Sequence, residues 1–386
     1  DNIIGRWGGN LALGGNLMHR RHKSMSTGVE LVVPDLFSIN NSKNKPDVEQ
    51  RYSEKKINSI YGTGQVNYDG WAFLDLTFRN DWSSTMSKKN RSFFYPSVST
   101  SWVISDMLEK IDKPLPSWFT YAKVRASFAE VGNDLDPYQL YNTYYIGQAP
   151  DGSTTANQNE ILYNEDVRSE LIKSWEVGTE LRFLQNRLGF DFSWYKTNAT
   201  RQLLNIPMDG LSGFKSRKIN AGNIENKGIE LMVNARPIQT ASGFNWDIMV
   251  NFSKNKNRII ELYKSAEEEI FLYTLGGYDN LQVYARAGGN YGEIWGTRLK
   301  RVEDKNSPHY GKLITENGLP TSSTEKEKIG DQQAKALMGI TNTFTYKGWS
   351  LSFLIDARFG GDIFSGTLQM MEQSGTSNKT VVNGQR

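Results

Sequence analysis

The stretch "INAGNIENKGIELMVNARP", residues 219–237, joins a Gly- and Asn-rich turn to a run in which apolar and polar residues alternate. The apolar members of that run are Ile229, Leu231, Val233 and Ala235. A phosphate-binding loop would need a helix after the turn, so that backbone amides and the helix dipole converge on the anion. Alternation predicts a strand instead. Gly and Asn are then best interpreted as a loop re-entering a sheet, where tight backbone geometry is required.

The same alternation recurs along the chain in runs of roughly nine to twelve residues, long enough to cross a bilayer when tilted. The clearest runs are "GWAFLDLTFRND" (70–81), "WEVGTELRF" (175–183), "LGFDFSWYKTN" (188–198), "FNWDIMVNFS" (244–253) and "GWSLSFLIDARFG" (348–360). Aromatic residues tend to end the apolar faces, as membrane-interface girdles do. No apolar run reaches the length of a transmembrane helix. A soluble β-sandwich also alternates, so alternation alone leaves both folds open.

Connection lengths favour the membrane barrel. Short connections lie at 68–70, 185–187, 238–243, 288–292 and 347–348, and long ones at about 15–56, 132–172, 201–223, 255–279 and 303–337. Strands that alternate in direction place the long loops on one side, as in an outer-membrane barrel with short periplasmic turns and long extracellular loops. The segment 105–120 is a longer connection on the side where the other connections are short turns, and it is long enough to contain a brief helix. We therefore predict an all-β, antiparallel transmembrane β-barrel segment of roughly thirteen or fourteen strands.

Composition narrows the function classes. The 386 residues include 45 basic and 42 acidic side chains, a net charge of +3, so no broad cationic surface for nucleic acid is expected. Cysteine is absent, which excludes disulfides and thiolate metal sites. No nucleotide-binding, nucleophile-elbow or zinc-protease motif occurs. We expect no enzyme activity, no catalytic residues and no cofactor.

Metal ligands are also not expected. His19 and His22 lie in a basic stretch, "MHRRHK", without an acidic or Cys partner at ligand spacing, and His309 is isolated. The acidic segments "GNDLDPYQL" (132–140) and "YNEDVRSE" (163–170) lack the Gly and terminal Glu of a calcium-binding EF-hand loop. They are interpreted as surface loops.

One carboxylate pair resembles a glycosidase site only superficially. Glu176 and Glu180 share a strand face, but four residues at about 3.3 Å each separate them by roughly 13 Å. Glycosidase carboxylates lie about 5 to 9.5 Å apart. A solvated barrel wall explains the pair better.

An ordered set of motifs carries a family resemblance. The motifs are "VVPDLFSINNS" (32–42), "FRNDWSST" (78–85), "YPSVSTSWVISD" (95–106), "AKVRASFAEVGND" (122–134), "SWEVGTELRF" (174–183), "NAGNIENKGIEL" (220–231), "FNWDIMVNFSKNKNRIIEL" (244–262) and "YKGWSLSFLIDARFGGDIF" (346–364). Each is short, but their order spans most of the chain. The sequence resembles the barrel of SusC-like TonB-dependent outer-membrane transporters, the RagA/SusC family.

The resemblance implies that residues 1–386 are a middle-to-late part of a 22-stranded barrel, with the N-terminal plug and the closing strands not recognisable. It implies import of oligosaccharides or peptides across the outer membrane of a Gram-negative bacterium. The implied partners are membrane lipid, a SusD-like surface lipoprotein that caps the barrel, and TonB acting through the plug. The segments "ENGLPTSSTEKEK" (316–328) and "KIGDQQAKALMG" (328–339), with Ala334 in place of a proline, depart from the family pattern, which puts any cation site in that loop in doubt.

Two other functions are kept as alternatives: a passive porin or adhesion barrel without TonB coupling, and a soluble carbohydrate-binding β-domain. For the importer, strand direction places Arg79, Asp81, Tyr195 and Thr197 on the inward face near the outer rim. Their hydrogen-bonding and aromatic groups could meet a sugar or peptide, and the alternative for each is a hydrated wall without ligand contact. The long loop 132–172 is where specificity is expected.

Overall fold

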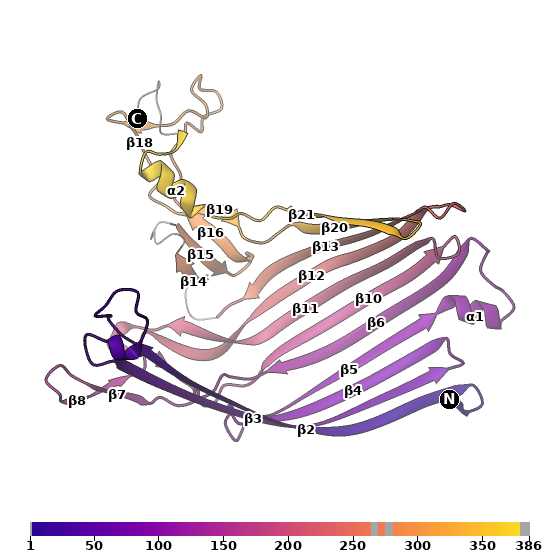
Figure 1. Cartoon of the computed structure of the whole chain (residues 1–386), viewed down its shortest axis with the longest axis horizontal. Coiled ribbons are helices and arrows are strands. Elements are labelled where there is room, and N and C mark those ends of the chain that lie inside the picture. The colour runs from indigo at the N-terminus through magenta and orange to yellow at the C-terminus, as the bar shows by residue number, and fades with distance from the viewer. Residues whose placement is uncertain (1, 264–268, 275–280, 379–386) are drawn as a thin grey trace. The chain divides into compact units, whose positions relative to one another are not determined.

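A computed structural model describes residues 2–263, 269–274 and 281–378. Its principal sheet has thirteen strands within these ranges (Figure 1). They are β1 (Asn2–Ile4), β2 (Trp7–Gly28), β3 (Asp47–Tyr68), β4 (Ala72–Ser83), β5 (Ser92–Val103), β6 (Phe119–Asn133), β9 (Ile161–Leu162), β10 (Glu170–Phe183), β11 (Leu188–Pro207), β12 (Ser216–Gln239), β13 (Asn245–Glu261), β20 (Ala336–Tyr346) and β21 (Trp349–Phe359).

The order of the sheet follows the chain, β1-β2-β3-β4-β5-β6-β10-β11-β12-β13-β20-β21, and β9 pairs in parallel with β12. This meander confirms the predicted all-β class and the approximate strand number. Among the described residues, no helix is both long and apolar enough to cross a bilayer.

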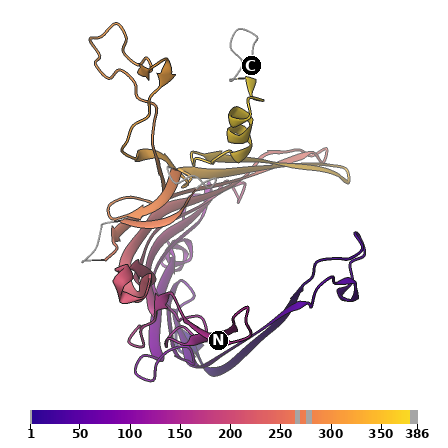
Figure 2. The ribbon, with the colours of Figure 1, turned by 90° about the vertical axis from the view of Figure 1, so that its left-hand side faces the viewer.

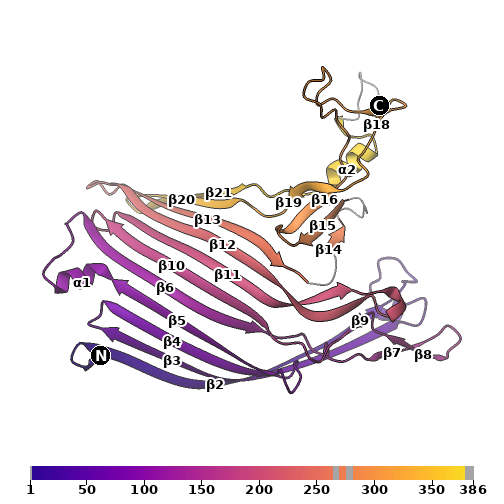
Figure 3. The same cartoon turned by 180° about the vertical axis from the view of Figure 1, so that it is seen from behind.

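The remaining elements are short. The strands are β7 (Tyr144–Gln148), β8 (Thr154–Gln158), β14 (Glu269–Thr274), β15 (Leu281–Arg286), β16 (Tyr291–Gly296), β17 (Thr315–Glu316), β18 (Leu319–Pro320) and β19 (Glu327–Asp331). The helices are η1 (Ile39–Asn41), α1 (Ile104–Lys110), η2 (Gly210–Ser212) and α2 (Gly366–Gln373), η marking 3-10 geometry. Figure 3 shows α1 between the end of β5 and the start of β6, so the brief helix predicted within 105–120 is confirmed.

The chain divides into two compact units, and each is described by itself. The first comprises Asp1–Thr100, Phe128–Lys173 and Thr200–Asn220. The second comprises Ser101–Ser127, Ser174–Ala199 and Ala221–Arg386.

The apolar face of the first unit is clearest on β2. Leu11, Leu13 and Leu17 share one face of the strand, and their relative exposures are 76%, 72% and 82%. Gly64 and Gly62 of β3 lie directly opposite Leu11 and Leu13. Such exposure is costly in water and is what a lipid-facing wall requires.

Aromatic residues gather where the short turns lie, as predicted for an interface girdle. In the first unit, the ring centroids of Trp7 and Tyr68 are 4.8 Å apart, and those of Tyr68 and Trp71 are 5.7 Å apart. In the second unit, Phe119 and Phe183 stack with centroids 4.8 Å apart. Within each unit, these contacts lie where a short turn joins two strands.

The predicted extents of several long loops are wrong. β2 and β3 each have 22 residues, so the loop predicted for 15–56 is reduced to residues 29–46. The loop predicted for 201–223 is likewise shortened, because β11 runs to Pro207 and β12 begins at Ser216. The strands extend well beyond the nine to eleven residues that cross a bilayer. Their outer parts carry charged side chains on both faces, which removes the alternation that marks a strand in sequence.

The short length of the connection at 288–292 predicts a turn between two strands of the principal sheet, and this prediction is wrong. The turn joins β15 to β16 within a separate four-stranded sheet of order β14-β15-β16-β19, termed here the loop sheet. Residues 255–261 of the loop predicted at 255–279 belong to β13, and residues 336–337 of the loop predicted at 303–337 belong to β20. The remainder of both loops forms one connection between these strands, and residues 264–268 and 275–280 lie outside the described residues. Figure 2 shows residues 297–326 leaving the loop sheet after β16 and returning at β19.

The stretch 219–237 is a strand throughout, so the predicted strand is confirmed but the predicted loop re-entry is displaced. Gly222 has a φ of +82°, and the register of β12 with β13 shifts between Asn223 and Ile224. A β-bulge within the strand therefore requires the glycine.

Two small apolar cores lie at the loops rather than inside the sheet. Met86, Leu135 and Val167, all 4% exposed or less, pack with Leu140 and Leu203 in the first unit. In the second unit, Ile259, Leu262 and Ala285 pack with Ile224. These two groups are called the first and second loop cores below.

Candidate functional site

Arg79 and Asp81 are neighbours on the polar face of β4, as their spacing predicts. The Arg79 Nε donates to Asp81 Oδ1 at 2.7 Å, and Arg79 Nη2 donates to Ser59 Oγ at 2.6 Å. The hydroxyl of Tyr95 donates to the other oxygen of Asp81. Asp81 is only 7% exposed, whereas a third of the Arg79 side chain remains open. Asp81 therefore holds Arg79 in place, and sequence reasoning missed the partners Ser59 and Tyr95.

Asp134 is the most enclosed acidic side chain of this region. Its Oδ1 lies 2.5 Å from Lys55 Nζ, and its Oδ2 accepts hydrogen bonds from Ser83 and from Thr85 Oγ1, the latter at 3.0 Å. Leu135 follows it directly into the first loop core. The ion pair with Lys55 and these hydrogen bonds fix the segment "GNDLDPYQL".

Tyr195 and Thr197 lie on one face of β11 in the second unit. The Tyr195 hydroxyl donates to Asn255 Oδ1 at 3.2 Å, and Thr197 Oγ1 lies 3.1 Å from Ser174 Oγ. The Tyr195 ring lies across Gly228, where an added Cβ would come within 2.7 Å of its hydroxyl. The backbone oxygen of Lys254 would be closer still, so both the Lys254 backbone and the Tyr195 ring require glycine at position 228.

Tyr195 begins a chain of side-chain amides, termed the amide ladder. Asn255 Nδ2 donates to Asn226 Oδ1 at 3.1 Å, and Asn257 Nδ2 donates to the same oxygen at 2.9 Å. Asn257 Oδ1 in turn accepts from the backbone amide of Tyr291 at 2.8 Å. Sequence reasoning missed the ladder, although the alternation of β12 and β13 places all three asparagines on the polar face.

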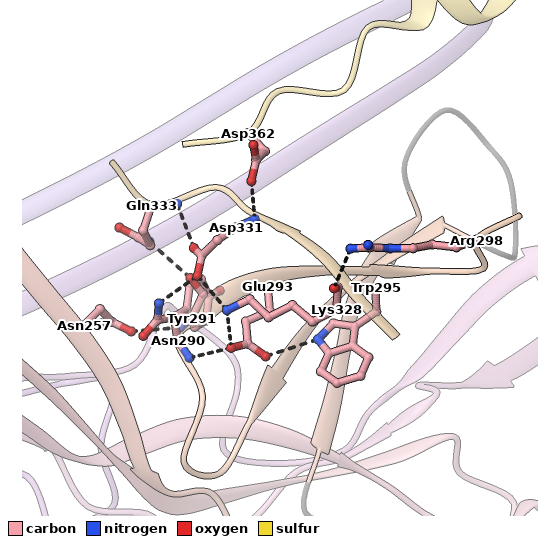
Figure 4. A network of polar contacts seen from close by, with 10 residues as sticks. All are labelled: Asn257, Asn290, Tyr291, Glu293, Trp295, Arg298, Lys328, Asp331, Gln333 and Asp362. Atoms are coloured by element: carbon pink, nitrogen blue, oxygen red, sulfur yellow. Dashed lines mark hydrogen bonds and ion pairs between the residues drawn. The ribbon is translucent and has the colours of Figure 1, made fainter. Parts of the chain in front are cut away.

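The ladder leads into a polar network at the loop sheet (Figure 4). Glu293, 6% exposed, accepts from Lys328 Nζ at 2.7 Å and from Trp295 Nε1 at 3.2 Å. Lys328 also lies 2.9 Å from Asp331 Oδ2. The backbone amide of Asp331 donates to Asp362 Oδ2 at 2.8 Å, which ties β19 to the segment after β21.

The network fixes two ionisation states. Burial alone would lower the pKa of Lys328, but its hydrogen bonds to Glu293 and Asp331 outweigh burial and raise that pKa. Burial would raise the pKa of Asp331, but hydrogen bonds from the Gln333 amide, Lys328 and Asn290 lower it below its usual value of 3.8. Both groups are therefore charged at neutral pH.

A pH dependence of the loop sheet follows from these directions. The pKa of Asp331 is lowered in the folded protein, so its contribution to stability is lost as the pH falls through that folded-state pKa. The pKa of Lys328 is raised, so its contribution to stability is lost as the pH rises through its folded-state pKa. We expect Trp295 fluorescence and protease resistance to be constant between about pH 5 and 10 and to decline below about pH 4. Asp331→Asn should reduce the acid decline, and an undiminished decline would contradict this role of Asp331.

A second polar cluster lines a cavity of about 680 Å³ in the second unit. Arg125 on β6 donates from Nη2 to Asp191 Oδ1 at 2.7 Å and to Ser193 Oγ at 2.6 Å, both on β11. It reaches across β10 at Gly178, where an added Cβ would lie 2.7 Å from the guanidinium carbon. Glu176 joins this cluster by accepting from Ser193 at 3.2 Å.

The carboxylates rejected as a glycosidase pair have separate partners. The Glu176 carboxylate lies 3.7 Å from Arg125 Nε, whereas Glu180 accepts from Arg182 Nη2 at 2.6 Å. The two glutamates therefore contact different arginines, and Arg125 is shared between Glu176 and Asp191, as expected of a hydrated wall.

The histidines have ordinary surroundings. His19 contacts Glu54, and Lys312 Nζ lies 3.4 Å from His309 Nδ1. Over the ranges that the structure describes, no group of three or more His, Cys, Asp or Glu side chains is placed to hold a metal ion.

The features described define a class of protein. One face of the strands is exposed and apolar and the other is polar, with aromatic residues at the short turns and long loops opposite. This is the construction of an outer-membrane β-barrel wall.

The family described as "TonB dependent receptor-like, beta-barrel" matches residues 2–318, and the chain belongs to it. The chain is 27% identical over 348 residues to TonB-dependent receptor P3 of Formosa agariphila, covering 85% of this chain and 34% of that protein. It is 26% identical over 317 residues to TonB-dependent receptor SusC of Bacteroides thetaiotaomicron, covering 78% and 31%. The chain thus spans about a third of the length of the curated relatives that it matches.

The fold has a solved counterpart. A structure of the RagAB peptide transporter superimposes with a TM-score of 0.75 at 18% identity, covering 92% of this chain and 39% of that one. The resemblance to SusC-like receptors is therefore confirmed, and with it the location in the outer membrane. Because these relatives are receptors and not enzymes, the family assignment also agrees with the prediction of no enzyme activity.

Proposed function

We propose that the full-length protein imports an oligosaccharide or a peptide through a plugged barrel, with energy from TonB and a SusD-like lipoprotein as its surface cap. Residues 1–386 would form part of its barrel domain. Family membership supports TonB coupling, and the likeness to SusC and to the RagAB peptide transporter supports the substrate classes and the lipoprotein partner.

The observation that carries the substrate class is the amide ladder. Neutral amides each offer a donor and an acceptor, and Tyr195 adds an aromatic face with a hydroxyl. These groups suit the hydroxyls of a sugar or the amides of a peptide better than they suit a metal chelate. The ladder runs over Tyr195, Asn255, Asn226 and Asn257 on the polar face.

The four predicted site residues take different roles in this proposal. Tyr195 and Arg79 would contact the substrate, because each has a partly exposed polar group. Asp81 would position Arg79 through the 2.7 Å hydrogen bond. Thr197, bonded to Ser174, would position the strand segment that carries Tyr195.

The test uses the full-length protein and two probes, a neutral oligosaccharide mixture and a tryptic peptide mixture. We expect Asn226→Ala, Tyr195→Phe and Arg79→Ala each to weaken binding of one probe by about five- to tenfold, the loss of one or two hydrogen bonds. Asn58→Ala is the matched control, since Asn58 lies opposite Leu17 on the apolar face. Unchanged binding in the three variants would remove these residues from the site.

Energy coupling needs a separate measurement. Uptake of the bound probe should fall to background in cells that lack TonB. Undiminished uptake in those cells would contradict energised import and favour the passive-porin alternative.

A further inference from the structure

The apolar face of β2 ends in a cationic strip. Trp7, Leu11, Leu13 and Leu17 occupy alternate positions on that face. The next positions on the same face are His19, Arg21 and Lys23, and the register places Lys56, Glu54 and Tyr52 of β3 directly opposite them. The face changes from apolar to charged within two residues.

The height of this change matches the edge of a bilayer. The ten residue-to-residue steps from Trp7 to Leu17 span about 33 Å along the strand, or about 23 Å along the membrane normal at a tilt of roughly 45°. An outer-membrane barrel has an apolar band about 25 Å tall. His19 to Lys23 then lie at about 28 to 37 Å above Trp7, within the polar headgroup layer.

The strip carries more positive than negative charge. Glu54 is its one carboxylate: it contacts His19, accepts from the Tyr52 hydroxyl at 2.6 Å, and lies 3.7 Å from both Arg21 Nε and Lys56 Nζ. The side chains of Arg21 and Lys56 are 61% and 58% exposed. Arg21 and Lys56 therefore each contact Glu54 and keep an exposed surface that a further anion can reach.

We propose that this strip, Arg21, Lys23 and Lys56 with His19, binds the phosphate groups of the phosphorylated glycolipid of the outer leaflet. Anionic headgroups attract basic residues that border an apolar span, and a guanidinium forms paired hydrogen bonds with phosphate. The acyl chains of the same lipid would cover Leu11, Leu13 and Leu17 below. Arg20 and His22 lie on the opposite face of β2 and take no part.

The experiment compares purified full-length protein with diphosphorylated lipid A, dephosphorylated lipid A and inorganic phosphate, using native mass spectrometry and titration in detergent. We expect Arg21→Glu to weaken binding of diphosphorylated lipid A by at least about fivefold. Arg20→Glu, the same charge change one residue away on the other face, should alter it less than about twofold.

Three outcomes would overturn the proposal. The first is equal affinity of the Arg21→Glu and wild-type proteins for diphosphorylated lipid A. The second is equal affinity of the wild type for lipid A with and without phosphate, a comparison that does not depend on any variant folding. The third is displacement of lipid A by inorganic phosphate at similar concentration, which would indicate a simple anion site.

Discussion

Asp134→Ala should free the loop 134–169 from the end of the principal sheet, at a cost of about 3–5 kcal/mol in local stability. The side chains of Asp134 and Lys55 are only 6% and 16% exposed, so the substitution leaves a nearly buried ammonium group without its counter-ion. Ser83 and Thr85 lose their acceptor at the same time. Amide hydrogen exchange at Val167, 1% exposed in the first loop core, measures the opening free energy.

The same loop offers a matched control. Asp166 pairs with Lys89 at 3.2 Å, but both side chains are about 70% exposed to water. Such a surface pair contributes less than about 1 kcal/mol. Asp166→Ala should therefore leave Val167 protected, and equal loss of protection in the two variants would show that burial of the Asp134 pair is unimportant.

Ile259→Ala should detach the loop sheet from β13, with a loss of about 2–5 kcal/mol in local stability. Ile259 is completely buried in the second loop core. Its backbone also donates to Gly289 at 2.9 Å and accepts from Gly288 at 2.7 Å, so a shift of Ile259 would disturb the β15–β16 turn. The measurement is the exchange protection of Val283, which has no exposed surface.

Ile260→Ala controls for the removal of the same side-chain atoms one residue away. Ile260 is 44% exposed, so its replacement creates no closed cavity. We expect less than about 1 kcal/mol of destabilisation. If Val283 loses protection equally in both variants, packing at Ile259 does not hold the loop sheet.

The strands of the wall were predictable because a lipid-facing and a water-facing side impose period-two alternation. That signal fails where both faces meet water. His19, Arg21 and Lys23 continue β2 but alternate with other polar residues, so the sequence indicated a loop there. The turn at 288–292 was also recognisable as a turn, but local sequence carries no information on which sheet its strands join.

The sequence predicted which site residues are neighbours on one strand, but not their partners on other strands. Alternation placed Arg79 and Asp81 side by side, two residues apart on one strand. Their partners Ser59 and Tyr95 depend on the register between strands, and Asp134 pairs with Lys55, 79 residues away in sequence. One chain without an alignment does not specify such distant pairings.

The two loop cores have an evolutionary consequence. Each keeps its apolar residues at the base of a long loop, whereas the tip of that loop, residues 141–160 in one case and 297–326 in the other, lies beyond the core. A tip can therefore be lengthened, shortened or exchanged without opening the hydrophobic packing that holds its base. The sheet and the loop cores can therefore stay the same while a tip changes, although each tip carries exposed aromatic and aliphatic side chains such as Tyr144, Tyr145 and Leu319.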